Sequence, residues 1–294
     1  MRHGMDDLLT LMQVLRDAEQ GCPWDLQQDW DSIVPHTLEE AYEVADAIER
    51  RSFDELPGEL GDLLFQVVYY AQFGAEERRF DFADIVDTLT AKMLRRHPHV
   101  FPDGTLASRR PSGVSADDVQ TQQVNSRWES LKAAEREERA QAERTNDIPS
   151  VLDDVPRTLP ALSRAAKLSK RAARVGFDWP DAKGVIAKIR EELAEVEEAL
   201  AAGDQSHAQE EVGDLLFAVT NLARSLKADP EQCLRATNTK FERRFRYVER
   251  ELSAAQRPLS DASLDEMETH WQAAKAQEAQ SQEKQSQEKQ PSHF

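Results

Sequence analysis

The sequence has little of what builds disulfide-rich or membrane-spanning proteins. Its two cysteines, Cys22 and Cys233, lie in opposite halves of the 294-residue chain, so we expect reduced thiols in a cytoplasmic protein. The first ten residues carry charges where a signal peptide needs an apolar core, and the longest apolar run, around 63–71, is too short to cross a bilayer. Glycine is scarce at 11 residues, whereas Ala, Leu, Glu, Arg and Gln dominate. This composition predicts an all-α protein.

Positive charge is also scarce. The chain has 37 Lys and Arg residues against 55 Asp and Glu residues, which gives a net charge of −18. Such an excess argues against nucleic acid or an anionic membrane as a partner. It leaves room for a small anionic ligand, provided that cations reverse the field locally.

The chain does contain an internal repeat of acidic motifs. Glu-Glu-x-x-Glu followed by Glu-x-x-Asp occurs at 39–43 and 59–62, and again at 191–195 and 211–214, at an offset of 152 residues. Leu-Leu-Phe follows the second motif in both copies. Self-similarity of this kind indicates that one carboxylate-bearing helical unit occurs twice.

Proline positions and composition divide the chain. We predict an N-terminal helical domain over 1–145 that includes a Pro-, Gly- and Ser-rich loop at 102–115. A linker marked by three prolines follows over 146–160, and a C-terminal helical domain covers 161–276. The Gln-, Glu- and Lys-rich tail at 277–294 has almost nothing to bury and is predicted to be disordered.

Apolar residues that recur every three or four positions predict the helices of both domains. In the first domain, Pro35 is expected to begin a helix that ends near Arg51, and Ser52 or Asp54 is expected to cap the next one. The remaining helices are predicted over 5–16, 82–96, 117–144, 162–174, 185–202, 207–226, 230–253 and 264–275.

The acidic motifs place carboxylates on shared helix faces, since residues three or four apart are neighbours. If the two helices of each copy form an antiparallel hairpin, four or five acids meet at one seam. Glu43 is then level with Glu59, and Glu195 with Glu211. Asp62 faces either Glu39 or Glu40. By the same construction, Asp214 faces either Glu191 or Glu192.

Carboxylates packed together repel one another unless a cation lies among them. All-oxygen ligation suits Mg²⁺ or Mn²⁺, whereas zinc would need Cys or His and a di-iron bundle would need paired Glu-x-x-His motifs. The alternative is a solvated acidic face on a long helix. Duplication alone gives no reason to keep every acid in both copies, so the repeat favours the metal site.

Basic residues repeat as well. Lys92-x-x-Arg95-Arg96 matches Lys240-x-x-Arg243-Arg244 at an offset of 148. A lysine and two arginines close together on a helix suit a polyphosphate, although a salt-bridged surface helix would carry the same pattern.

A tryptophan motif repeats at an offset of 143, as Trp128-x-x-x-Lys132 and Trp271-x-x-x-Lys275. Tryptophan on a polar helix either stacks on a base or anchors the helix to the core. The sequence leaves both roles open.

Together these residues resemble the MazG family of nucleoside triphosphate pyrophosphohydrolases, within the all-α NTP pyrophosphohydrolase superfamily. The paired acidic motifs are the superfamily's signature, and the likeness extends over about residues 5–275. Segments specific to the family lie at 21–25, 61–65, 96–101, 176–179 and 240–245.

The resemblance implies a tandem repeat of two MazG-type helical-bundle domains in a homodimer. It implies hydrolysis of NTPs and dNTPs to monophosphates and pyrophosphate with Mg²⁺, or Mn²⁺ in its place, for nucleotide-pool house-cleaning. The C-terminal domain would do most of the catalysis. The implied metal ligands are Glu192, Glu195, Glu211 and Asp214, with Glu40, Glu43, Glu59 and Asp62 as the second copy.

The remaining site residues concern substrate and catalysis. Glu191 is the candidate to accept the proton of the attacking water, beside Glu192. Lys188 and Arg190 precede it, where the first copy has His36 and Leu38, and they put extra cations within reach of a triphosphate. The resemblance implies that the phosphates are held by Lys240, Arg243 and Arg244 and the nucleoside by Trp271.

Two other functions compete with this interpretation. A non-catalytic nucleotide- or protein-binding helical module would need the basic helix and the tryptophan but no clustered acids. A specialised pyrophosphohydrolase, acting on dUTP or phosphoribosyl-ATP, would share the acids but not the segments at 22–25 and 97–101.

Overall fold

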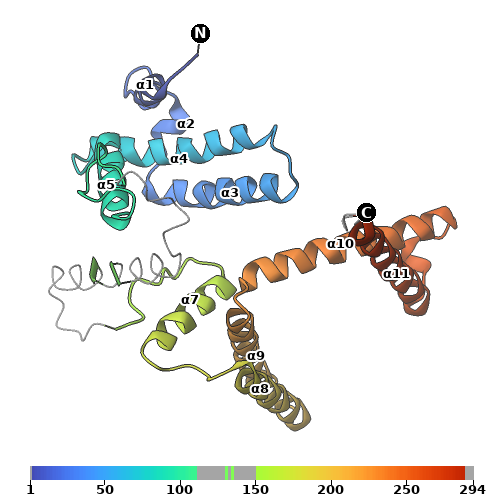
Figure 1. Cartoon of the computed structure of the whole chain (residues 1–294). Coiled ribbons are helices and arrows are strands. Elements are labelled where there is room, and N and C mark those ends of the chain that lie inside the picture. The colour runs from blue at the N-terminus through green and yellow to red at the C-terminus, as the bar shows by residue number, and fades with distance from the viewer. Residues whose placement is uncertain (1, 111–129, 132–133, 136–149, 289–294) are drawn as a thin grey trace, which may run out of the picture. The chain divides into compact units, whose positions relative to one another are not determined.

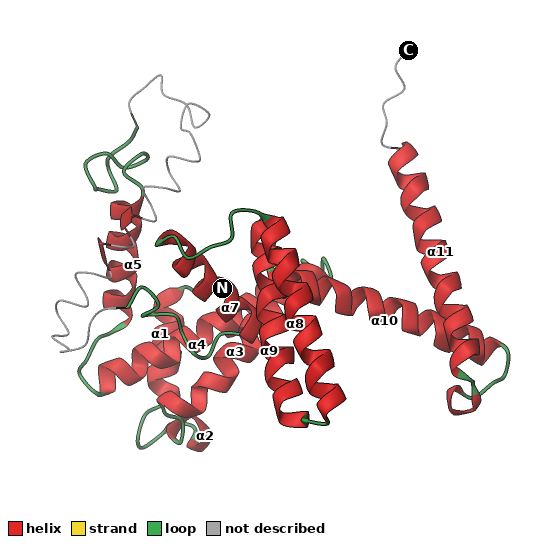
Figure 2. Cartoon of the chain, turned by 90° about the horizontal axis from the view of Figure 1, so that it is seen from below, coloured by secondary structure: helices red, strands yellow, loops and turns green. Residues whose placement is uncertain are grey.

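The structure is a computed structural model that describes residues 2–110, 130–131, 134–135 and 150–288, with side chains to residue 280. Within these ranges the regular elements are helices, and no strand occurs (Figures 1 and 2). The chain divides into two compact units, Met1–Thr145 and Asn146–Phe294. The all-α prediction and the tandem repeat are thus confirmed.

Unit 1 is built on a helix hairpin. Helices α3 and α4 run antiparallel along each other, and α1 and α5 both pack on α4 (Figure 1). Its helices are α1 (Met5–Leu15), α2 (Pro23–Leu26), α3 (Trp30–Glu49), α4 (Leu56–Glu76) and α5 (Phe82–Arg96).

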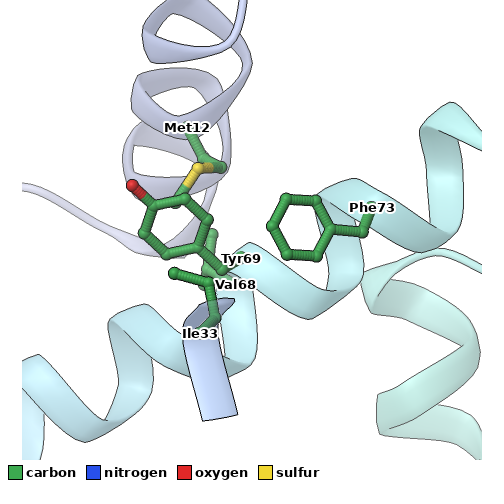
Figure 3. Packing of buried hydrophobic residues seen from close by; sticks show 5 residues of the cluster. All are labelled: Met12, Ile33, Val68, Tyr69 and Phe73. Atoms are coloured by element: carbon green, nitrogen blue, oxygen red, sulfur yellow. The ribbon is translucent and has the colours of Figure 1, made fainter. Parts of the chain in front are cut away.

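A compact apolar cluster joins α1, α3 and α4 (Figure 3). Its members are at most 3% exposed, and burying side chains of this size stabilises a fold by about 1.5–3 kcal/mol each. The polar end of Tyr69 is satisfied within the cluster, because its hydroxyl donates to the buried carboxylate of Asp25. The cluster consists of Met12, Ile33, Val68, Tyr69 and Phe73.

Unit 2 repeats the hairpin. Helices α8 and α9 pack along each other, α7 packs on α9, and α11 packs on α10. Small side chains such as Val185, Ala199, Ala208 and Ala218 are buried in α8 and α9 and let these helices approach closely. The elements are α7 (Ala161–Arg174), α8 (Ala182–Ala202), α9 (Gln205–Ser225), α10 (Pro230–Ala254), the 3₁₀ turn η1 (Leu259–Asp261) and α11 (Leu264–Glu288).

The prediction that Pro35 begins a helix is wrong. Helix α3 begins at Trp30, and Pro35 lies inside it. Asp29 and Ser32 form a capping box, with hydrogen bonds of 2.8 and 2.9 Å that satisfy the first backbone N–H groups. The predicted caps of the next helix are also wrong, because the residue before α4 is Glu55, which makes no capping hydrogen bond.

The prediction of a disordered tail is wrong for residues 277–288, which continue α11 as helix. Gln, Glu, Lys and Ala are good helix formers, so a helix already anchored on α10 continues through them. Residues 289–294 lie outside the described part of the chain. So does most of the helix predicted over 117–144, where the four described residues are helical.

No helix of the described residues combines the length and the apolar character that crossing a membrane requires.

Candidate active site

The helix hairpin of each unit brings three predicted acids together. In unit 2, one carboxylate oxygen each from Glu192 and Glu195 on α8 and Glu211 on α9 lies within 4.8 Å of the others. In unit 1 the equivalent group has the same spacing and consists of Glu40, Glu43 and Glu59. The antiparallel hairpin inferred from the sequence is therefore present in both units.

The turn of each hairpin sets this register. Gly203 closes α8 in the left-handed region, with φ of 73°, and Asp204 caps α9 at once by accepting from the backbone N–H of His207 at 3.1 Å. Glu195 lies eight residues before Gly203 and Glu211 eight after it, so the two carboxylates meet across the seam.

Two further predicted acids stay outside these groups. Asp62 and Asp214 are exposed, although the charge of Asp62 still acts on Glu40. Three acids, rather than the four or five expected, make up each close group in the described chain. Glu191 is exposed and lies next to Glu192 in the chain, outside the close group of unit 2.

Neighbouring acids and burial raise the pKa of one member of each group. Burial raises the pKa of Glu195, and the hydrogen bond with Glu192 and the charge of Glu211 raise it further. In unit 1, burial and the charges of Glu43 and Asp62 raise the pKa of Glu40. Both groups therefore hold more negative charge than their surroundings offset, which is the condition a divalent cation relieves.

Lys188 is the cation nearest to the unit 2 acids. Its Nζ lies 2.7 Å from Glu191 and 2.8 Å from Glu192, and these two hydrogen bonds raise the pKa of Lys188. The equivalent residue of unit 1 is His36, which lies 3.7 Å from Glu39. Lys188 therefore partly neutralises the acidic group and holds two of its carboxylates in place.

His207 is a neighbour of the acids that the sequence patterns did not single out. Its Nδ1 lies 3.4 Å from Glu211, one helical turn further along α9. The spacing of four residues was the available signal.

The predicted phosphate-binding arginines share one carboxylate on α11. The Nε groups of Arg243 and Arg244 donate to Glu278 at 2.6 and 2.9 Å. A pocket of about 390 Å³ beside them is lined by Arg243, Arg244, Tyr247, Arg250, Ala274, Gln277 and Glu278. Lys240 lies exposed on α10, and Arg190 is exposed on α8.

Trp271 anchors α11 to α10. Its half-buried ring lies 5.2 Å from that of Phe241, and the guanidinium of Arg244 lies 5.7 Å from the Trp271 ring centroid. Trp271 thus packs on α10, and its contact with a nucleoside stays a prediction.

Unit 1 repeats the arrangement of arginines. Arg95 and Arg96 both donate to Glu135, with Nη2 of Arg95 at 2.6 Å. The sequence reading missed Glu135 and Glu278, although they share the 143-residue offset of the two tryptophans.

The protein is thus all-α, with a group of acids on each helix hairpin that could hold a divalent cation and a pair of arginines in each unit that share one carboxylate. The comparison with known proteins agrees. The MazG nucleotide pyrophosphohydrolase domain matches this chain twice, over residues 28–101 and 181–248.

Several curated proteins are similar to this chain, two of them along nearly their whole length. A nucleoside triphosphate pyrophosphohydrolase of Escherichia coli K12 is 51% identical over 276 residues, which are 93% of this chain and 98% of the relative. The nucleoside triphosphate pyrophosphohydrolase/pyrophosphatase MazG of Thermotoga maritima is 36% identical over 92% of this chain and 95% of its own. A nucleoside triphosphate pyrophosphohydrolase of Mycobacterium tuberculosis is 36% identical over 58% of this chain and 45% of its own. The chain belongs to the MazG family.

Proposed function

We propose that this protein is a Mg²⁺-dependent nucleoside triphosphate pyrophosphohydrolase, which converts NTPs and dNTPs to monophosphates and pyrophosphate. The observation that carries the proposal is the group of three acids on the α8–α9 hairpin, with Glu192 only 5% exposed. Membership of the MazG family and the names of the relatives above support the reaction.

The acidic group fits the metal that this reaction needs. Its donors are all carboxylate oxygens, close enough to share one ion, and Mn²⁺ could replace Mg²⁺ in such a set. Glu192, Glu195 and Glu211 would hold the ion, with Asp214 as a fourth ligand. When bound, Mg²⁺ lowers the pKa of water and neutralises charge on phosphoryl oxygens.

The chain's own residues perform the remaining steps. Glu191 accepts the proton of the water whose oxygen attacks the α-phosphorus, while the bond from the α-phosphorus to the bridging oxygen breaks and pyrophosphate departs. Lys240, Arg243 and Arg244 bind the β- and γ-phosphates and stabilise the charge of the leaving group. Arg190 adds positive charge beside the acids, and Trp271 contacts the nucleoside.

Unit 2 carries most of the activity in this proposal. Its group of acids includes the buried Glu192, whereas Glu40 of unit 1 is half-buried and Glu43 is exposed. Lys188 adds a permanent cation where unit 1 has His36.

The protein works as a homodimer joined through α8 and α9. Apolar residues recur along one stripe of each helix and are exposed in the single chain. An apolar stripe of this spacing is typical of a face that packs on another helix. The stripes consist of Ile186, Leu193 and Leu200 on α8 and Val212, Leu216 and Val219 on α9.

The enzyme acts in the cytoplasm, in keeping with Cys22 and Cys233 as free thiols.

A pyrophosphate-release assay tests the proposal. We expect release from NTPs with Mg²⁺ and none with a chelator. Glu192→Gln and Glu211→Gln should each lower kcat at least about 100-fold, because even residues that only hydrogen-bond to a metal's ligands typically matter 10- to 100-fold. The matched controls, Glu40→Gln and Glu59→Gln in unit 1, should keep most of the activity.

Circular dichroism of each variant should show unchanged helix content, which separates lost chemistry from lost fold. Full activity of both unit 2 variants would remove the metal assignment. Phosphate-bearing ligands that bind without turnover would instead favour the non-catalytic binding module. A panel of canonical and oxidised NTPs and dNTPs then defines the substrates.

A further inference from the structure

Glu278 lies where the proposed function has no use for a negative charge. It is the carboxylate that α11 places against the two arginines assigned to the phosphates. Its side chain is 19% exposed, and the hydrogen bonds from Arg243 and then Arg244 hold its pKa below the ordinary value. The carboxylate is thus ionised at neutral pH and fixed between two cations.

The contacts with Glu278 use only some of the N–H donors of each guanidinium group, and Arg244 is the less exposed of the two arginines, at 18%. Glu278 binds Arg243 through Nε, and Arg244 through Nε and Nη2. A guanidinium carries five N–H donors in a planar fork, so a carboxylate on the Nε side leaves outer Nη donors for a second anion. Arg243 is 57% exposed, which gives such an anion access.

The pocket also keeps an excess of positive charge. Arg250, whose Nε lies 3.7 Å from Glu251, lines it together with Arg243 and Arg244, so among the lining residues three guanidinium groups face the single carboxylate of Glu278. Glu278 therefore orients the arginines without neutralising the pocket.

The same contact occurs in unit 1, where Arg95 and Arg96 bind Glu135. Glu135 and Glu278 each lie seven residues after the repeated tryptophan, at the offset of 143 that the tryptophans share. A carboxylate kept in both copies at one position relative to the tryptophan, and bonded to both arginines in each, belongs to the repeated site.

We propose that Glu278 is a positioning residue that holds Arg243 and Arg244 with their outer donors ready for the triphosphate. The inference rests on the proposed function, because it presumes that these arginines bind phosphate. A free arginine side chain loses rotamer entropy when it is fixed, and Glu278 has already fixed both before the substrate arrives.

The test uses the full-length protein with Glu278→Gln, which keeps the size of the side chain and removes its charge. We expect the KM for NTP and the inhibition constant of pyrophosphate to rise about tenfold each. The inhibition constant of the nucleoside monophosphate should not change, because it lacks the β- and γ-phosphates. Glu268→Gln on the same helix removes the same charge and should leave all three constants unchanged.

A second measurement separates positioning from a structural role. In the Glu278→Gln background, Arg243→Ala should cost less pyrophosphate affinity than it does in the wild type, because the arginine is no longer held in place. Additive losses would overturn the proposal. So would unchanged or tighter pyrophosphate binding by Glu278→Gln, since tighter binding would mean that Glu278 competes with the phosphates.

These outcomes are independent of the proposed reaction. If the wild type binds pyrophosphate but releases none from NTPs, the proposed function fails, while calorimetric titration with pyrophosphate still decides the role of Glu278.

Discussion

Among the acids of the site, Glu192 is the one that the fold buries most, at 5% exposure. A carboxylate is seldom buried this far without compensation, because removing its hydration costs several kcal/mol. Lys188 supplies one positive charge for the acids of the unit 2 group. The residual negative charge is what fits this group to a divalent cation.

The half-buried carboxylate of Glu135 leads to a prediction about pH. Hydrogen bonds from Arg96 and Arg95 lower the pKa of Glu135 from 4.5 to about 2. A lowered pKa contributes stability that is present above about pH 4.5 and is lost as the pH falls toward 2. We expect Glu135→Gln to destabilise unit 1 by about 1 kcal/mol at pH 7 and to have little effect near pH 2.

Urea denaturation of both proteins across this pH range, followed through unit 1, gives the comparison. Asp46→Asn serves as a control, since its carboxylate is also ion-paired in unit 1 but with Arg50, four residues away. A destabilisation by Glu135→Gln that stays constant down to pH 2 would contradict the ion-pair account.

The positions of single residues were predictable where their signal is local. Glu192, Glu195 and Glu211 are brought together by helix periodicity and a short turn, both of which can be read from sequence. The contact of Glu278 with Arg243 and Arg244 was not predicted, because these partners lie 35 and 34 residues away in the chain. They meet only through the packing of α11 on α10. Lys188 was expected to reach substrate, and its present contacts are with acids.

At the scale of elements, the turns of the two hairpins share an unusual backbone conformation at equivalent positions. Gly203 and Arg51 both adopt positive φ, of 73° and 60°, and they lie 152 residues apart, at the offset of the acidic motifs. The left-handed region suits glycine and costs other residues about 1–2 kcal/mol. Unit 1 therefore carries this cost at Arg51, and unit 2 does not.

Replacing the turn glycine tests this account. Gly203→Ala should lower the free energy of unfolding of unit 2 by about 1 kcal/mol, because alanine is strained at φ of 73°. Nothing lies within 4 Å of the added Cβ, so crowding does not contribute. Chemical denaturation measures the change.

Gly213→Ala is the matched control. Its Cβ would also meet nothing within 4 Å, but Gly213 lies inside α9 with ordinary helical backbone, so alanine there should stabilise by up to about 1 kcal/mol. Equal effects of the two substitutions would exclude backbone strain at the turn.

Element boundaries were predictable where capping is strong. The helix predicted over 82–96 is α5 as observed, because Asp81 caps its start and Pro98 follows its end. Pro35 was misleading, since proline is favoured in the first turn, but the Asp29 cap lies further upstream. The tail was judged by its lack of apolar residues, although α11 extends into it.

At the scale of the whole molecule, the apolar stripes on α8 and α9 lead to a prediction about how two copies of the chain associate. Leu216→Asp puts a charge in the middle of the α9 stripe. If this face joins two copies, the substitution should weaken the dimer at least about thirtyfold, as loss of a central interface residue does. Sedimentation over a range of protein concentrations measures this.

Phe177→Asp is the matched control, because Phe177 is 78% exposed but lies outside α8 and α9. It should leave the association constant unchanged. Monomeric wild-type protein, or equal effects of both substitutions, would remove α8 and α9 as the interface.

The short turn at Gly203 and Asp204 also limits how this protein can change length. One residue inserted between Gln205 and Glu211 would rotate the Glu211 carboxylate about 100° around the axis of α9, away from its partners on α8. Surface connections usually tolerate such insertions. In this stretch, however, the number of residues between the turn and Glu211 decides which way the Glu211 carboxylate faces. Lineages that descend from this gene should accept substitutions here far more readily than gains or losses of residues.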